Sequence, residues 1–147
     1  MIRRFTMLDK RKFYINGQWV KPSKKNDFDV INPSDESVCA VISLGSQKDT
    51  NAAVSAARAA LPLWSSSSKE DRIALLERLY SIYERRMDEM AEIISMEMGA
   101  PIDFSKRSQA PSGTEAIEDF LNQLKKFEFE KQLDDSDNQL IYEPKGV

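Results

Sequence analysis

The fold is set first by residues 13–20, which read Phe-Tyr-Ile-Asn-Gly-Gln-Trp-Val. Two β-prone runs flank Asn16-Gly17, the pair best suited to the two positive φ angles of a type I′ turn, so a β-hairpin is predicted. Two further strands are predicted at residues 28–31 and 38–44, separated by a turn around Pro33. The first 45 residues are therefore expected to form four short antiparallel strands.

Basic residues are concentrated at the start of the chain. Residues 1–25 carry eight Lys or Arg and one acidic residue, a net charge of about +7, which leaves about −10 for the rest. A nucleic-acid or membrane arm would add regularly spaced aromatics or an amphipathic helix, and neither is present. The run from Ile2 to Leu8 is too short and too interrupted for a signal peptide. We expect a basic, disordered arm over residues 1–12 and a cytoplasmic protein with no nucleic-acid or membrane partner.

Helical patterns follow Gly45. Ser46 and Asp49 have the spacing of a capping box, so a helix is predicted from there to near Pro62. Ser67 and Glu70 repeat that spacing before a second helix, which is expected to run to Met98 as one rod of about 46 Å and to end at Gly99. Its apolar residues recur every three or four positions and predict a core-facing stripe: Ile73, Leu76, Tyr80, Tyr83, Met87, Met90 and Ile94.

The last third of the sequence predicts a third helix and a second hairpin. The helix, from about residue 103 to 127, contains Pro111 and Gly113, so a kink or break is expected near Pro111. Alternating apolar residues on both sides of an acidic turn at 134–138 predict a hairpin over residues 128–143. Residues 144–147 then begin an apolar strand, and we expect the polypeptide to be incomplete.

The composition excludes most catalytic templates. The 147 residues include no histidine, which removes Ser-His-Asp, Cys-His and His-ligated metal chemistry, and 31% charged residues exclude a membrane protein. Five isolated glycines form no phosphate-binding loop. The single cysteine, Cys39, lies in an apolar run and is expected to be a small buried residue. The residues themselves therefore indicate no catalytic, cofactor-binding or metal site.

The order of several short motifs closely resembles the N-terminal part of the aldehyde dehydrogenase superfamily. The likeness covers residues 13–147, about the first third of a family member. The motifs are Tyr14 to Val20, Ile31-Asn32-Pro33, Val41 to Gly45, the Ala52 to Ala60 helix ending in Leu61-Pro62-Leu63-Trp64, Arg72 to Leu79, Glu97-Met98-Gly99-Ala100-Pro101, and Tyr142-Glu143-Pro144-Lys145-Gly146-Val147.

The resemblance implies an α/β fold whose N-terminal β-hairpins and helices flank a Rossmann-type cofactor domain that is mostly missing from this chain. Residues 13–127 would be the N-terminal part of the cofactor-binding domain, 128–143 an oligomerisation hairpin, and 144–147 the start of the first Rossmann strand. It also implies a homo-oligomer that uses NAD or NADP to oxidise a small aldehyde to a carboxylic acid. In the family, a cysteine attacks the aldehyde, hydride passes to the nicotinamide, and a glutamate assists hydrolysis.

The residues that perform this chemistry in the family would follow Val147, and Cys39 does not match the surroundings of the nucleophile. Through an ungapped count from the Gly99-Ala100-Pro101 motif, the resemblance implies that Ser108 and Ser112 lie beside the aldehyde entrance. The alternative interpretation is that both are solvated residues on the surface of a helix. We therefore expect this chain to be inactive alone and to bind no cofactor. The alternative is a non-catalytic interaction or assembly protein derived from the same fold.

Overall fold

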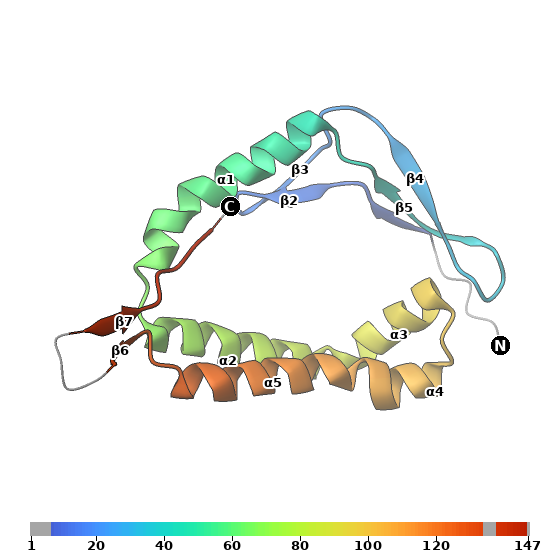
Figure 1. Ribbon diagram of the computed structural model, residues 1–147. Helices are drawn as coiled ribbons and strands as arrows, with labels where there is room; N and C mark the ends of the chain where they lie inside the picture. The colour runs from blue at the N-terminus through green and yellow to red at the C-terminus, as the bar shows by residue number, and fades with distance from the viewer. Residues whose placement is uncertain (1–6, 134–137, 147) are drawn as a thin grey trace.

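The structure is a computed structural model that describes residues 7–133 and 138–146. Figure 1 shows the first long helix and the strands of the N-terminal region along one side of the molecule, a pair of long helices along the other, and a C-terminal hairpin that projects from one end. The elements are β1 (Leu8–Lys10), β2 (Phe13–Ile15), β3 (Gln18–Val20), β4 (Asp27–Ile31), β5 (Val38–Ser43), α1 (Gln47–Ser65), α2 (Lys69–Arg85), α3 (Met87–Met98), α4 (Ile102–Phe104), the π-helical turn η1 (Ser105–Gln109), α5 (Pro111–Lys126), β6 (Glu130–Gln132) and β7 (Gln139–Ile141).

The first predicted hairpin is confirmed. Strands β2 and β3 pair antiparallel, with Phe13 opposite Val20. Asn16 and Gly17 both have positive φ, 52° and 75°, as a type I′ turn requires. Strands β4 and β5 also pair antiparallel as expected, but they belong to a separate sheet of order β1-β5-β4.

The expectation of a disordered arm over residues 1–12 is wrong for residues 8–10. These residues form β1, which runs parallel to β5 with Leu8 opposite Ala40. Strand β5 is the most buried strand, with Cys39, Ala40 and Val41 each less than 9% exposed. Pairing on both of its edges satisfies its backbone hydrogen bonds, which explains why the arm is recruited to the sheet. Residues 1–6 lie outside the described part of the chain.

Helix α1 begins where the sequence predicts and ends later. The Ser46 side chain accepts a hydrogen bond from the Asp49 amide, and the Asp49 side chain accepts one from the Ser46 amide, which completes the capping box. The helix does not end near Pro62 but continues to Ser65. Because Pro62 lies in the last turn, its missing N–H removes only one backbone hydrogen bond, and the helix tolerates it.

The second helix departs from the prediction at its start and in its middle. Its cap is Ser68 with Asp71, not Ser67 with Glu70. It also breaks at Arg86, which has φ −110° and ψ 13°, so the expected 68–98 rod is two helices, α2 and α3. The Arg86 amide donates to the Tyr83 carbonyl at 3.0 Å and closes a tighter last turn, while its guanidinium binds both carboxylate oxygens of Glu89 at 2.8 Å in the new first turn. Gly99 ends α3 with φ 70°, as predicted.

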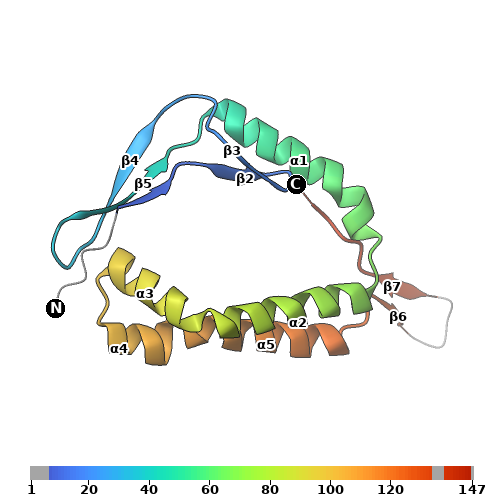
Figure 2. The same cartoon turned by 180° about the vertical axis from the view of Figure 1, so that it is seen from behind.

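The expected break near Pro111 takes the form of a π-helical turn. The Ala110 amide donates to the Ser105 carbonyl at 2.9 Å, five residues back, and Pro111 then begins α5. Helices α2 and α5 lie side by side, and both views of the ribbon show the pair (Figures 1 and 2). A Cβ at Gly113 would lie 2.5 Å from Cζ of Tyr83, so the absence of a side chain there permits the close approach.

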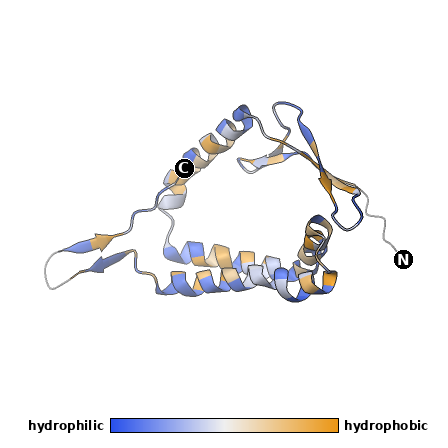
Figure 3. Cartoon of the chain, turned by 45° about the vertical axis from the view of Figure 1, so that its right-hand side comes forward, coloured by the Kyte–Doolittle hydropathy of each residue, from blue (hydrophilic) through white to orange (hydrophobic). Residues whose placement is uncertain are grey.

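The chain exposes far more surface than a compact domain. Its accessible surface is 11584 Å², whereas a compact monomer of 16.8 kDa exposes about 7,700 Å². The predicted core stripe is only partly covered, because no residue of α2 is buried, and neighbouring Leu79 is 46% exposed. Figure 3 shows apolar segments on α1 as well as on the helices opposite. The predicted apolar faces therefore exist but remain largely uncovered.

Candidate functional site

The two serines expected at the substrate entrance lie around the junction of η1 and α5. Ser108 lies in η1, and Ser112 lies in the first turn of α5; both are exposed. The Ser112 hydroxyl donates to the Gln109 carbonyl at 2.6 Å, so it satisfies a backbone group at the junction. In contrast, Ser105 is fully buried, and its hydroxyl donates to Oε1 of Gln109 at 3.1 Å. Ser108 and Ser112 thus lie on the surface beside this junction, and no activating base is seen to contact them among the described residues.

Cys39 is a structural residue, as predicted. It is 4% exposed, and its thiol donates to the Val30 carbonyl of the neighbouring strand at 3.3 Å. A catalytic thiol needs access to substrate and a group that stabilises the thiolate. Cys39 lacks that access, and the prediction that it is a small buried residue is confirmed.

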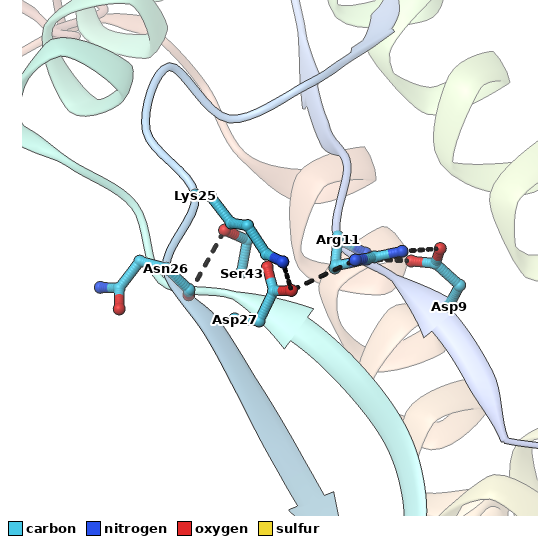
Figure 4. Close-up of polar contacts among 6 residues, drawn as sticks. All are labelled: Asp9, Arg11, Lys25, Asn26, Asp27 and Ser43. Atoms are coloured by element: carbon cyan, nitrogen blue, oxygen red, sulfur yellow. Dashed lines mark hydrogen bonds and ion pairs between the residues drawn. The ribbon is translucent and has the colours of Figure 1, made fainter.

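A polar cluster that the sequence did not reveal joins β1 to β4 (Figure 4). Arg11 donates to both carboxylate oxygens of Asp9, at 3.0 and 2.7 Å, and to Asp27 at 3.2 Å. Lys25 lies 3.5 Å from the same Asp27 oxygen. Hydrogen bonds from Arg11 lower the pKa of Asp9 to about 2, and the pKa of Arg11 is raised above its usual value. Asp9 and Arg11 hold each other in their charged forms, so this pair is suited to ion pairing rather than proton transfer.

A broad hollow of about 960 Å³ adjoins this cluster. Cationic side chains dominate its lining, although Arg11 is engaged by two aspartates. The lining residues are Asp9, Lys10, Arg11, Lys12, Trp19, Lys21, Pro22, Lys25 and Asp27. No group of three or more potential metal ligands occurs within residues 7–133 and 138–146. The lining of the hollow therefore carries more positive than negative side chains.

A second local network surrounds Asp49 at the start of α1. Its carboxylate accepts from the amide and hydroxyl of Ser46, at 2.9 and 2.7 Å, and from the amide of Ser23 at 2.9 Å. These hydrogen bonds lower the pKa of Asp49 to about 2. The carboxylate thereby fixes the β3–β4 connection against the N-terminus of α1, which is a structural role.

The second predicted hairpin is confirmed as a structure. Strands β6 and β7 pair antiparallel, with Glu130 opposite Ile141, in a sheet that has two strands within the described ranges. The hairpin projects from the end of the helix pair in Figures 1 and 2, and Leu133 and Ile141 are each 57% exposed. The expected acidic turn at 134–138 lies mostly outside the described residues.

Residues 19–147 match the aldehyde dehydrogenase family. The chain belongs to this family. It is 39% identical over 142 residues to 3-succinoylsemialdehyde-pyridine dehydrogenase of a Pseudomonas species, a match that covers 96% of this chain and 29% of the relative. The crystal structure of an aldehyde dehydrogenase from Bartonella henselae matches with TM-score 0.86 and 46% identity, over 89% of this chain and 28% of that one.

A second solved relative is a mutant of aldehyde dehydrogenase C from Pseudomonas syringae, complexed with NAD⁺ and octanal. It matches with TM-score 0.81 and 36% identity, over 83% of this chain and 25% of that chain. The chain thus spans less than a third of the length of these aldehyde dehydrogenases. These matches confirm the predicted family and the predicted fold, the N-terminal part of the aldehyde dehydrogenase architecture.

Proposed function

We propose that this chain is the N-terminal portion of an NAD(P)-dependent aldehyde dehydrogenase whose full-length form oxidises a small aldehyde to a carboxylic acid. The observation that carries the proposal is the family match over residues 19–147, together with the fact that the chain covers only 29% of the length of the Pseudomonas relative. The Pseudomonas syringae relative with NAD⁺ and octanal supports the cofactor and substrate classes. NAD and NADP remain equal candidates for this protein.

The N-termini of α1 and α2 do not fit the pyrophosphate of a dinucleotide. A pyrophosphate binds where glycines open the N-terminus of a helix to an anion. Here the carboxylates of Asp49 and Asp71 occupy the N-termini of α1 and α2 as caps. Cys39 is buried, so it cannot attack an aldehyde. We therefore propose that this chain alone is inactive and that residues outside it bind the cofactor and perform the chemistry.

The chain's own contribution is architectural. Residues 13–127 would form the N-terminal part of the cofactor-binding domain, and residues 144–147 would begin its first Rossmann strand. Residues 128–143 would join copies of the protein through the projecting hairpin, because exposed strand edges favour pairing with another chain. Ser108 and Ser112 would border the aldehyde entrance.

Other parts of the proposal rest on the sequence alone. A cytoplasmic location and the absence of nucleic-acid and membrane partners stay predictions. In the part of the chain that the structure describes, no helix combines the length and apolar character needed to cross a bilayer.

A steady-state assay tests the proposal. The full-length protein and the isolated 147-residue chain are each mixed with short and long aldehydes and with NAD or NADP, and reduced nicotinamide is followed by absorbance. We expect turnover by the full-length protein and none by the isolated chain. Turnover by the isolated chain would contradict its proposed inactivity. No turnover by the full-length protein with any pair would favour the interaction-protein alternative.

The entrance assignment has its own test in the full-length protein. Ser108→Trp places a large ring on η1, and we expect KM to rise more for long aldehydes than for short ones. The matched control is Ser55→Trp, on the exposed surface of α1, which we expect to leave KM unchanged. An unchanged KM for every aldehyde in the Ser108 variant would contradict the assignment.

A further inference from the structure

Arg72 connects three parts of the chain at the base of the projecting hairpin. Its Nε donates to Oγ of Ser67 at 2.9 Å, and its Nη2 donates to the Ser65 carbonyl at 3.1 Å and, more weakly, to the Trp64 carbonyl at 3.4 Å. All three acceptors belong to the end of α1 or to the connection that follows. The guanidinium therefore fixes the start of α2 to the end of α1.

The same guanidinium lies against aromatic rings. Its central carbon is 5.5 Å from the centre of the Phe129 ring and 5.8 Å from that of Trp64, both within the range of a cation–π interaction. Phe129 immediately precedes β6, so Arg72 also reaches the first strand of the hairpin. A planar guanidinium can make hydrogen bonds at its edge while its faces contact rings, which an ammonium group cannot do.

The contact extends to both strands of the hairpin. Phe129 meets Phe127 edge to face at 4.9 Å, and Phe127 lies 5.1 Å from Tyr142, which follows β7. The Tyr142 amide donates to the Phe129 carbonyl at 2.8 Å. We call Arg72, Phe127, Phe129 and Tyr142 the hairpin base. Through it, one guanidinium is linked to the chain entering and leaving the hairpin.

The hairpin needs such a base. Each of its strands is only three residues long, and an isolated two-stranded hairpin is marginal in water. Lys69 supplies another tie, with Nζ donating to the carbonyls of Lys125 and Phe127 at 3.1 and 3.2 Å, but these groups end α5 rather than belong to the strands. Of these two cations, only Arg72 contacts a ring at the start of β6.

We propose that Arg72 is a positioning residue that fixes the direction of the β6–β7 hairpin relative to α1 and α2. Its relevance to assembly rests on the proposed function, in which the hairpin joins two copies of the protein. A hairpin held in one direction associates with less loss of conformational entropy than one that moves freely.

Amide hydrogen exchange in the full-length protein tests this inference. Arg72→Met keeps the aliphatic stem and removes the guanidinium; Arg72→Lys keeps the charge without the planar fork. We expect about a tenfold faster exchange of the hairpin amides in Arg72→Met, and most of that effect in Arg72→Lys, with unchanged exchange in the middle of α5. Arg78→Met, on the exposed surface of α2, is the control and should change neither region.

Two results would overturn the inference. One is hairpin exchange that stays at the wild-type rate in Arg72→Met; the other is faster exchange that is equal in the hairpin and α5, because that indicates general destabilisation. If Arg72→Met does not fold, Phe129→Leu removes the ring and leaves α2 intact. The same hairpin-specific tenfold increase is expected there, and wild-type exchange in that variant would overturn the inference.

Sedimentation velocity separates this inference from the proposed assembly role. If the hairpin amides exchange faster and the dissociation constant between copies rises about tenfold, both are supported. If the amides exchange faster and the dissociation constant does not change, Arg72 positions the hairpin as inferred, and the proposal that the hairpin joins copies fails.

Discussion

Helices α5 and α2 approach each other closely at Gly113. We expect Gly113→Ala to lower the free energy of unfolding, and we expect removal of the Tyr83 ring to reverse the sign of that effect. In Gly113→Ala, the new Cβ would lie 2.5 Å from Cζ and 3.0 Å from Cε1 of Tyr83. Such overpacking costs about 1–3 kcal/mol. Displacing the Tyr83 hydroxyl also removes its 3.0 Å hydrogen bond to the Ala110 carbonyl, which costs about 1 kcal/mol more in stability. Alanine is favoured over glycine within a helix by about 1 kcal/mol, so the expected net loss is about 1–3 kcal/mol.

The assay is native-state hydrogen exchange of α2 and α5 amides in the full-length protein, where a loss of 2 kcal/mol raises exchange about 30-fold. In a Tyr83→Ala background the clash is absent, so Gly113→Ala should instead stabilise α5 by up to about 1 kcal/mol. Gly45→Ala is the control, because its Cβ would meet atoms no closer than 3.8 Å, and it should cause no loss. Equal destabilisation in both Tyr83 backgrounds would refute the steric explanation.

Three further predictions concern single side chains. The pKa of Asp49 is lowered from 3.8 to about 2, so its carboxylate stabilises the start of α1 fully above about pH 4 and loses this effect toward pH 2. Hydrogen exchange of the early α1 amides should follow that pH profile, and Asp49→Asn should remove the pH dependence. Gly99→Ala should destabilise α3 by about 1–2 kcal/mol in the same assay, because φ is 70° and the new Cβ would lie 3.1 Å from Cβ of Pro33. Glu77→Gln should lower the free energy of unfolding, measured by urea denaturation, by less than about 1 kcal/mol, because its 2.9 Å ion pair with Lys125 is about half exposed. A larger loss would contradict the small contribution expected of this ion pair.

Local signals predicted the elements whose hydrogen bonds are local. Asn16-Gly17 determines the first turn and Ser46 with Asp49 determines the start of α1, because each signal acts within four residues. Local spacing alone cannot decide between two adjacent serines that could each cap α2. Both Ser67 and Ser68 have an acidic residue three positions later. The Ser67 hydroxyl instead donates to the Trp64 carbonyl and accepts from Arg72, and Ser68 is the cap.

Features created by distant parts of the chain were not predictable from patterns. Strand β1 exists because residues 8–10 pair with residues 40–42, more than 30 positions away. The ion cluster likewise depends on the meeting of Arg11 with Asp27 in three dimensions. No Gly or Pro marks the break at Arg86 in the sequence. The break coincides with the ion pair between Arg86 and Glu89 and with a tightened last turn of α2.

In the candidate site, too, some features could be predicted from the local sequence and others could not. Burial of Cys39 could be predicted from its apolar run and is confirmed. Ser108 and Ser112 were placed by family resemblance, and the structure shows them exposed near the η1–α5 junction. The proposed role of these serines at the aldehyde entrance stays a prediction.

The central claim is that these residues are an outer portion of a larger enzyme, with apolar faces that other parts of the protein cover. Differential scanning calorimetry of the isolated 147-residue chain tests it most directly, because an autonomous domain of that length absorbs about 100 kcal/mol in one cooperative transition. The account predicts no such transition for the isolated chain, in keeping with its 11584 Å² of exposed surface. A single cooperative transition of that size, from a compact monomer, would contradict it.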